Sequence, residues 1–188
     1  MPTPIGHSLM GAACYAGLKN KQFKWSAFWL FLILANLPDI DYLPGILIGA
    51  PNRFHHGITH SLGFSVLAGI IAGLLAKFAL NLKFLRAFWV CTAVVFSHVI
   101  LDYLCVDTSL PYGVPLLYPF SEESVLSPIL IFSDVYKGAT NRSFLAGLAE
   151  AHNWRTVMGE ILILAPIWGA VSLYKKYSKT RKANLATK

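Results

Sequence analysis

Residues 61–105 read SLGFSVLAGIIAGLLAKFALNLKFLRAFWVCTAVVFSHVILDYLC, and this stretch decides the fold class. Two apolar runs, about Ser61–Leu80 and Phe84–Cys105, flank a short connection that contains Lys83. A helix of roughly 20 apolar residues is long enough to cross a bilayer core of about 30 Å. The stretch therefore predicts two transmembrane helices joined by a short basic connection.

The composition of the whole chain also indicates a membrane protein. Of its 188 residues, 55% are hydrophobic and 13% are charged, whereas about a quarter of the residues in soluble domains are charged. The formal net charge of +7 arises from basic residues in short clusters between apolar runs, which is typical of membrane loops and not of a nucleic-acid-binding face. We predict a single integral-membrane domain over residues 1–188 that binds no nucleic acid. Cys14, Cys91 and Cys105 have no paired spacing, and free thiols are expected.

Three further apolar stretches are expected to be helical: about His7–Leu18, Trp25–Leu37 and Val157–Tyr174. The second is broken at Pro38, which disfavours helix at the residue before it, and is followed by the apolar Leu43–Ala50. The third is expected to tolerate Pro166. The fold class is therefore predicted to be an all-α polytopic membrane bundle of about four to five transmembrane or partly inserted helices.

Basic clusters predict the orientation of this bundle. They are Lys19, Lys21 and Lys24; Lys77, Lys83 and Arg86; and the tail, residues 175–188. The positive-inside rule assigns all three to the cytoplasm. Residues 38–60 and 106–156 then lie on the opposite side, where 106–156, with its apolar run Ile129–Phe132, is expected to form a partly helical, lid-like segment. Residues 1–6 carry no positively charged signal-peptide region, so the membrane helices are expected to direct insertion.

Ionisable side chains interrupt the apolar sequence at four places. The clusters are His7; Asp39 and Asp41; His55, His56 and His60; and His98 with Asp102. Such groups are costly inside a membrane and mark functional sites. A helical rise of about 1.5 Å per residue places all four roughly 18–25 Å from the basic ends of their helices. The sequence therefore predicts that they meet at one level, near the outer headgroup boundary, and that residues 1–120 form a metal-site core.

The residue types and spacings favour a metal ion. His98 and Asp102 are four residues apart and share one helical face, although a His–Asp hydrogen bond inside a bundle has the same spacing. Irregular backbone after Pro38 is tolerated at membrane depth where it lines a cavity. The combination of imidazoles and carboxylates suits zinc, with manganese or iron as alternatives.

Parts of the clusters, taken alone, also have structural interpretations. Asp39 or Asp41 can cap a helix. Ser61 or Thr59 can cap the helix that begins near residue 61. Gly57 permits a tight turn.

Five segments carry a family resemblance: Gly6-His7, Leu37-Pro38-Asp39-Ile40-Asp41, His55-His56-Gly57-Ile58-Thr59-His60-Ser61-Leu62, Ser97-His98-X3-Asp102 and Gly113-Val114-Pro115-Leu116-Leu117-Tyr118-Pro119. Their order resembles the YdjM-like family, described as LexA-regulated, membrane-bound metal-dependent hydrolases of the bacterial inner membrane. The resemblance covers residues 5 to about 120. It implies a multi-pass inner-membrane enzyme whose polar motif positions are His7, Asp39, Asp41, His55, His60, His98 and Asp102.

Two positions depart from the pattern of that family. His56 stands where the family usually has arginine, and Tyr42 stands where it often has histidine. If the arginine holds a phosphate, His56 would do so with a weaker, pH-dependent charge. Tyr42 removes one possible ligand.

These residues are expected to divide into two roles. The expected ligands are His7, Asp39, Asp41, His60, His98 and Asp102. Among them, His7 and Asp41 are candidates for a second ion or for orienting the other ligands. His55 or His56 is expected to act as a general acid/base or to bind the substrate anion. A site at headgroup depth predicts that a membrane lipid, or another amphipathic phosphoester or ester, is hydrolysed by metal-activated water. The sequence specifies no oligomeric state.

Other classes of protein fit the same clusters. A transporter or channel could use them as an ion pathway, but apart from residues such as Ser65 and Thr92 the helices carry few polar side chains towards their basic ends. A structural site would saturate its ion with protein ligands. The motif order is also similar to the first half of zinc-dependent phospholipase C and P1 nuclease. Their later ligands have no clear match, because His152 and Glu160 are eight residues apart.

Overall fold

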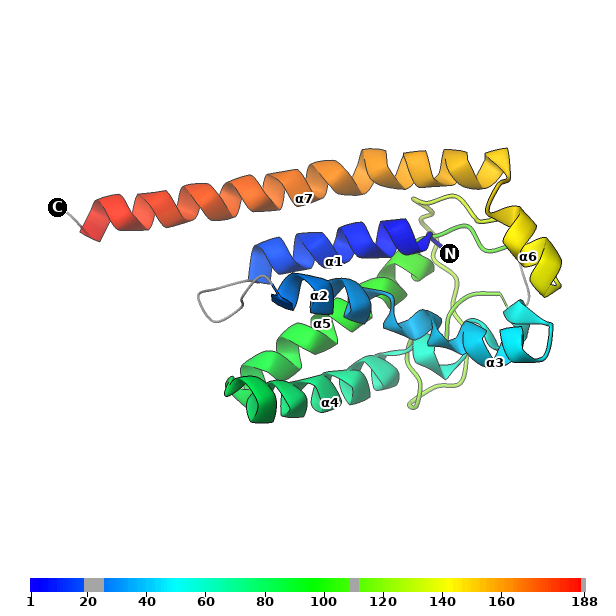
Figure 1. Cartoon of the computed structure of the whole chain (residues 1–188), viewed down its shortest axis with the longest axis horizontal. Helices are drawn as coiled ribbons and strands as arrows, with labels where there is room; N and C mark the ends of the chain where they lie inside the picture. Colours follow the sequence, from blue (N-terminus) through cyan, green and yellow to red (C-terminus); the bar gives the residue numbers. More distant parts are fainter. Residues whose placement is uncertain (19–25, 109–111, 187–188) are drawn as a thin grey trace.

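The long helices run roughly side by side, and the irregular segments gather at one end of them. The computed structural model describes residues 1–18, 26–108 and 112–186. The long helices are α1 (Pro4–Leu18), α2 (Ser26–Ala35), α4 (Leu62–Leu80), α5 (Phe84–Tyr103) and α7 (Ala151–Ala186) (Figure 1). The short helices α3 (Tyr42–Leu47) and α6 (Asn141–Gly147) lie near the N-terminal end of α1. Three 3-10 turns complete the set: Leu37–Asp41, Pro51–Phe54 and Ile58–His60.

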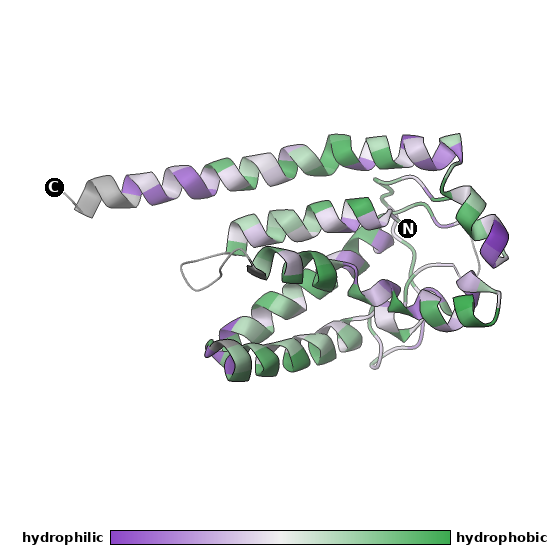
Figure 2. Cartoon of the chain, in the orientation of Figure 1, coloured by the Kyte–Doolittle hydropathy of each residue, from purple (hydrophilic) through white to green (hydrophobic). Residues whose placement is uncertain are grey.

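Hydropathy identifies the helices that can cross a membrane. Among the described residues, three segments are long and apolar enough: Leu62–Ala79, Phe84–Tyr103 and Ala151–Arg181. A bent pair, Ala27–Ala35 with Leu37–Leu47, is a fourth candidate, and its two parts meet at 56°. Apolar residues dominate α2, α4 and α5 in Figure 2. The predicted all-α membrane bundle is confirmed, and so are the two helices expected from residues 61–105.

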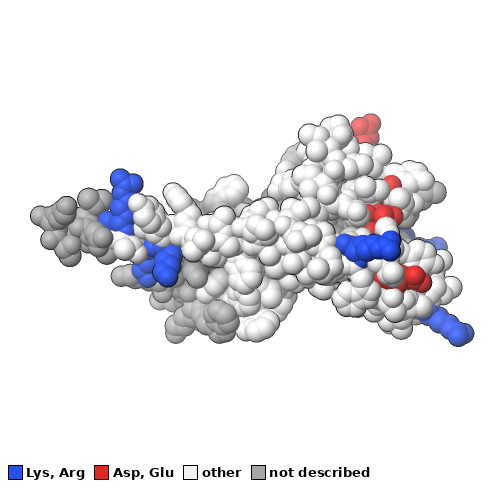
Figure 3. All heavy atoms as spheres, turned by 90° about the horizontal axis from the view of Figure 1, so that it is seen from above, with Lys and Arg blue, Asp and Glu red and all other residues white. Residues whose placement is uncertain are grey.

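Charged side chains lie towards the two ends of the bundle. On the face drawn in Figure 3, Lys and Arg without acidic neighbours lie near the C-terminal part of α7, Asp and Glu together with further Lys and Arg lie at the opposite end, and an uncharged belt lies between the two. Such a belt is what a protein presents to lipid tails, where charge is costly. The predicted basic loop with Lys19, Lys21 and Lys24 lies outside the described residues.

The last helix is longer than predicted. Instead of Val157–Tyr174, α7 spans 36 residues, tolerates Pro166 and continues through the basic segment after Tyr174. The reason is that hydropathy reports the lipid-embedded part of a helix, whereas Lys, Arg and Ala extend the same helix into water with good helix propensity. The basic segment from residue 175, which was expected to be a tail, is therefore helical as far as Ala186.

The described part of segment 106–156 is partly helical, as predicted. Its helical residues there are those of α6 and the first residues of α7. The apolar run Ile129–Phe132 is extended instead, because Phe132 pairs with Cys105 in an isolated β-bridge and Ile131 N donates to Leu104 O at 2.8 Å. In an extended run, successive side chains point to opposite sides, so the backbone can pair while one side chain is buried. A short apolar run in the sequence does not distinguish this conformation from a helix. Cys105, like Cys14 and Cys91, is a free thiol, as predicted.

A small-residue core holds the end of α2 against α5. Phe31, Ala35 and Val94 are at most 1% exposed and belong to one cluster. Helix α4 packs closely on α5, where a Cβ at Gly73 would lie 3.0 Å from the backbone nitrogen of Phe88. Small residues allow membrane helices to approach in this way. The packing places the last turn of α2 beside the part of α5 that carries the polar residues.

Glu160 of α7 holds the first turn of α1. Its side chain is 1% exposed and accepts hydrogen bonds from the Thr3 backbone N–H at 2.6 Å and the Thr3 hydroxyl at 2.5 Å. Gly6 lies against it, since a Cβ at Gly6 would lie 2.7 Å from Glu160 Oε2. A carboxylate at this place also interacts favourably with the helix dipole. The contact sets the position of His7, the next residue along α1.

We expect Glu160→Ala to destabilise the bundle. Loss of the two hydrogen bonds to Thr3 leaves buried donors without partners, which costs about 1–3 kcal/mol and corresponds to a fall in Tm of roughly 5 °C. Thermal unfolding in detergent measures the effect. Glu150→Ala is the matched control, because Glu150 is exposed. Equal Tm values for the two variants would show that Glu160 does not anchor α1.

Candidate metal centre

The four polar clusters of the sequence meet at the end of the bundle where α1 begins. The contributing residues are His7 of α1; Asp39 and Asp41 of the turn after α2; His55, His56 and His60 of the turns before α4; and His98 and Asp102 of α5. Every one of them except the half-buried Asp39 is buried. They form four groups of three whose potential ligand atoms lie within 4.8 Å of one another. Residues remote in sequence thus share one centre.

Asp102 is the carboxylate on which three imidazoles converge. Its Oδ1 lies 3.4 Å from His7 Nε2. Its Oδ2 lies 3.2 Å from His60 Nε2 and 3.1 Å from His98 Nε2. Asp39 Oδ1 faces the same atoms, 3.6 Å from the Nε2 of both His60 and His98. The Nε2 atoms and carboxylate oxygens therefore point into one small volume.

The backbone at the end of α2 orients His98. His98 Nδ1 lies 2.7 Å from the carbonyl oxygen of Ala35, the last residue of α2. That carbonyl has no partner further along the helix, so it accepts the Nδ1 proton and leaves Nε2 as the free nitrogen of the ring. Metal-binding histidines are commonly oriented by a backbone carbonyl in this manner. The break before Pro38 thus both ends α2 and orients a ring of α5.

Asp41 orients two histidines, His60 and His55, from outside this volume. Its Oδ2 lies 3.1 Å from His60 Nδ1 and its Oδ1 lies 3.0 Å from His55 Nδ1. The Thr59 hydroxyl donates to Asp41 Oδ2 at 2.9 Å. Asp41 is at the N-cap position of α3 but makes no capping hydrogen bond. Its contacts are those of a carboxylate that positions histidine ligands.

His7 and His98 stack face to face. Their ring centroids are 3.6 Å apart with an interplanar angle of 15°. Both ring nitrogens of His7 are buried without a hydrogen-bond partner. A buried, unpaired nitrogen costs free energy, so the ring is suited to a ligand that enters the centre.

His55 and His56 follow one another at the rim of the centre. His56 has a left-handed backbone, with φ of 59°, so the turn that Gly57 was expected to permit is made by the residue before it. His56 Nδ1 lies 3.6 Å from Asp107 Oδ2, which also accepts the Gly113 N–H at 2.6 Å. The Nε2 atoms of His55 and His56 are both buried without a hydrogen-bond partner. Each ring is therefore held by a carboxylate at one nitrogen and can exchange a proton or bind a cation at the other.

Burial and neighbouring carboxylates shift the pKa values of these rings in opposite directions. Burial lowers the pKa of His55 well below its usual value and lowers the pKa of His56, although the hydrogen bonds to Asp41 and Asp107 oppose the shifts. His60 is also buried, but its bonds to Asp102, Asp39 and Asp41 raise its pKa well above the usual value. A cation that binds His60 Nε2 must displace a proton, so acid weakens binding and alkali strengthens it.

The structure also shows contacts that the sequence did not predict. Asp107, which pairs with His56, lies just beyond α5, and an acid at a predicted membrane boundary is the signal that could have identified it. Thr59 binds Asp41 instead of capping α4, and Ser61 caps α4 by accepting from Phe64 N at 3.1 Å. Tyr42 stacks on His55 with ring centroids 4.1 Å apart. The position that lost a possible ligand thus supports a neighbouring ring.

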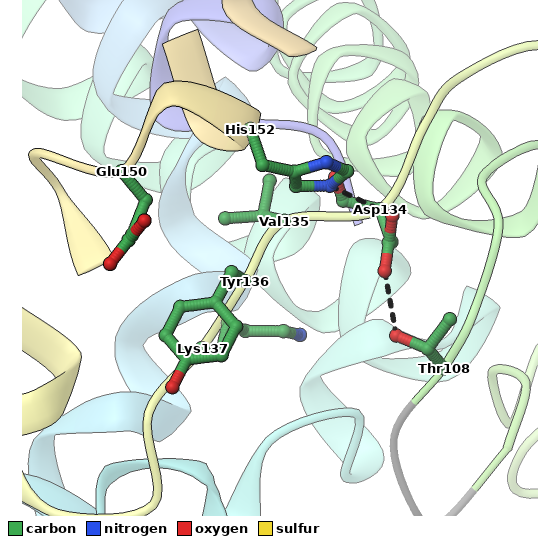
Figure 4. Close-up of a pocket in the computed structure, with 7 residues that line it drawn as sticks. All are labelled: Thr108, Asp134, Val135, Tyr136, Lys137, Glu150 and His152. Atoms are coloured by element: carbon green, nitrogen blue, oxygen red, sulfur yellow. Dashed lines mark hydrogen bonds and ion pairs between the residues drawn. The ribbon is translucent and has the colours of Figure 1, made fainter. Parts of the chain in front are cut away.

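Residues His152 and Glu160 lie apart from the centre. His152 Nε2 is 3.1 Å from Asp134 Oδ1, and the Thr108 hydroxyl donates to Asp134 Oδ2 at 2.8 Å (Figure 4). These side chains line a separate cavity of about 550 Å³. Glu160 is occupied by Thr3. Neither residue completes the ligand set, in agreement with the unmatched spacing.

The donor set fits a divalent metal ion. Both oxygens of Asp102, both nitrogens of His7 and Asp39 Oδ1 are buried and make no hydrogen bond, although all of them except His7 Nδ1 take part in the His–Asp ion pairs. Mixed imidazole and carboxylate donors are those of zinc and of manganese or iron sites. The four carboxylates of Asp39, Asp41, Asp102 and Asp107 carry a negative charge that divalent cations can offset. Several groups of the centre could therefore hold a metal ion.

The fold and the centre together define an all-α integral membrane protein with a buried His/Asp cluster that could bind metal. Comparison with known proteins places it more narrowly. The chain belongs to the YdjM inner membrane protein family, whose pattern it matches over residues 1–178. It is 31% identical over 132 residues to the inner membrane protein YbcI of Escherichia coli (strain K12), covering 68% of this chain and 73% of that protein. No solved structure matches the chain significantly.

Proposed function

We propose that the protein is a membrane-embedded, metal-dependent hydrolase that cleaves a phosphoester, or another ester, of a lipid or amphipathic substrate. The observation that carries the proposal is the arrangement of His7, Asp39, His60, His98 and Asp102 around one volume, beside two histidines with unpaired Nε2 atoms. Zinc is the proposed ion, with manganese or iron as alternatives. The family membership supports the membrane setting, and the centre supports the chemistry.

The residues of the chain divide the work as follows. When bound, a divalent cation supplies Lewis acidity, which makes water a nucleophile near neutral pH and offsets charge on the ester oxygens. His7, Asp39, His60, His98 and Asp102 hold the cation, and Asp41 orients His60 and His55. His55 or His56 takes up and returns the proton at Nε2, while Asp41 and Asp107 hold the two Nδ1 atoms. Histidine is the side chain that most often serves as a general acid or base in this role.

The position of the centre supports a substrate that reaches it from the membrane. Large apolar side chains are exposed around the polar end, among them Leu47 at 86% and Phe120 at 86%, and exposed apolar surface of this kind is suited to lipid. The basic residues near the C-terminal part of α7 support an orientation with that end in the cytoplasm. In this orientation the centre faces the non-cytoplasmic side of the bacterial inner membrane.

A blind pocket is favoured over an ion pathway by the lining of the bundle. The groove along α2 and α4, about 410 Å³ in volume, is lined by leucine, isoleucine, phenylalanine and alanine side chains alone. An ion that left the centre along this groove would meet no polar partner, at a high cost in free energy. We therefore place hydrolysis ahead of transport.

Metal analysis combined with hydrolysis assays tests the proposal. Purified wild-type protein should contain about one or two divalent ions per chain and should hydrolyse at least one member of a lipid phosphoester panel. His98→Ala and Asp39→Ala should lose both properties. His152→Ala, which removes the histidine outside the centre, is the matched control and should retain both.

Three outcomes would contradict the hydrolase. Metal without hydrolysis of any ester would indicate a structural site. Metal flux in proteoliposomes that depends on His98 would indicate transport. Unchanged metal content in both His98→Ala and Asp39→Ala would show that the converging side chains do not bind the ion.

A further inference from the structure

An apolar cavity opens directly beside the candidate metal centre. Its volume is about 450 Å³, within the usual range for small-molecule sites. The wall is formed by the start of α1, by α6, by the start of α7 and by residues 135–137, and Asp39 of the centre lies in it. The principal apolar lining residues are Ile5, Phe144, Leu148, Trp154 and Val157. We call this space the tail cavity.

One basic side chain, Lys137, lies in the wall of the tail cavity, and it also lines the cavity of about 550 Å³ beside His152. In the described part of the chain, its ammonium makes no ion pair within 4.0 Å. Burial lowers its pKa, and the charges of Asp102, Asp107 and Asp39 oppose that shift, so it lies within electrostatic range of the centre. Figure 4 shows its side chain turned away from the Glu150 carboxylate. An unpaired, half-buried ammonium beside a cavity is suited to an anion.

The backbone around Lys137 is held from two sides. Asn153 of α7 accepts from Tyr136 N at 2.7 Å and donates to Tyr136 O at 3.0 Å. Asn52 donates to Gly138 O at 3.1 Å. Lys137 therefore extends from a fixed point between α7 and the turns that carry His55 and His56. A side chain on such a support loses less freedom when it binds than one on a loose loop.

We propose that Lys137 binds the phosphate head of a lipid substrate whose acyl chain occupies the tail cavity. The cavity offers an apolar chain a site next to the centre, and Lys137 supplies the positive charge that a phosphate requires at the junction of the two. Exposed Leu148 and Trp154, at 64% and 56%, form a rim through which a lipid enters from the bilayer. The inference rests on the proposed hydrolase for the identity of the scissile bond. It assigns Lys137 to substrate binding.

Photolabelling tests head and tail together without relying on turnover. The probe is dodecylphosphonate with a diazirine at the chain end, added to metal-loaded protein in phosphatidylcholine nanodiscs. Wild-type labelling should map to Leu148, Trp154 and Val157 and should saturate. Lys137→Met should weaken the apparent affinity about tenfold, and Lys137→Arg should restore it to within about threefold. Lys83→Met, which changes an exposed lysine at the N-cap of α5, at the other end of that helix from Asp102, should bind like wild type.

Two further comparisons separate the head from the tail. The matching uncharged alcohol should label wild type and Lys137→Met equally. Leu148→Trp, which narrows the cavity without changing charge, should reduce labelling by the phosphonate, and methylphosphonate should compete weakly because it lacks the chain.

Several results would overturn the assignment. One is an equal affinity of wild type and Lys137→Met for the phosphonate at equal metal content. Another is labelling that is confined to exposed residues of α4. Metal content is measured on every sample. If the wild-type protein holds no metal and hydrolyses nothing, yet labelling still depends on Lys137 and the phosphonate, the hydrolase fails while the binding site stands.

Discussion

Asp102→Asn should abolish hydrolysis and lower metal affinity by at least about 100-fold. Asp102 is the carboxylate that faces His7, His60 and His98 at 3.1–3.4 Å. The amide retains the size of the side chain but loses its negative charge and presents a donor toward ring nitrogens. Removal of this charge takes away one ligand and the electrostatic attraction for the cation in a buried site. Metal titration with purified apoprotein measures the effect.

Asp134→Asn is the matched control for this substitution. Asp134 also lies 3.1 Å from a histidine, His152, but the pair is partly exposed and lies outside the centre. Its metal affinity and hydrolysis should equal those of wild type. If the two amide variants lose metal to the same extent, the cluster around Asp102 is not the binding site.

Removal of the metal should lower Tm by roughly 10 °C. An ion present at about a thousand times its Kd stabilises the native state by about 4 kcal/mol, and 1 kcal/mol corresponds to about 2–4 °C for a chain of this size. The charge of the centre adds to the effect, because Asp39, Asp41 and Asp102 all lie against His60, and removal of a divalent ion would leave less positive charge to offset the three carboxylates. Differential scanning calorimetry or fluorescence in detergent, with and without a chelator, gives the shift.

The same experiment on Asp102→Asn supplies the control. A variant that holds no metal should show almost no response to the chelator, within about 2 °C. Addition of zinc should restore the Tm of chelated wild type but not that of the variant. A chelator response of equal size in both proteins would mean that the ion stabilises the fold from another place.

Much of the fold could be predicted because hydropathy acts locally. The apolar runs at 61–80 and 84–105 became α4 and α5, since a helix satisfies its backbone within one segment and needs only length and apolar side chains to cross a membrane. The same argument failed at the ends of α7, where polar residues extend the helix beyond the lipid. It also failed at Ile129–Phe132, where pairing with the end of α5 decided an extended conformation.

The sequence by itself also indicated that the polar clusters form one centre. Imidazoles and carboxylates inside membrane-grade sequence are costly, so their presence at His7, Asp39, His60, His98 and Asp102 already indicated a common site. The type of each residue and its depth along a helix can be read from the sequence without knowing which residues it contacts.

Only the tertiary structure decided which partner each side chain has. Asp41, expected to hold an ion or to orient the ligands of one, contacts the Nδ1 atoms of His55 and His60, and the carbonyl of Ala35 orients His98. Asp107 and Lys137 lie beside the centre because the segment after α5 and residues 135–137 fold back against it. Hydrogen bonds and ion pairs act over a few ångströms, so they depend on how distant segments approach, which no local pattern of residues contains.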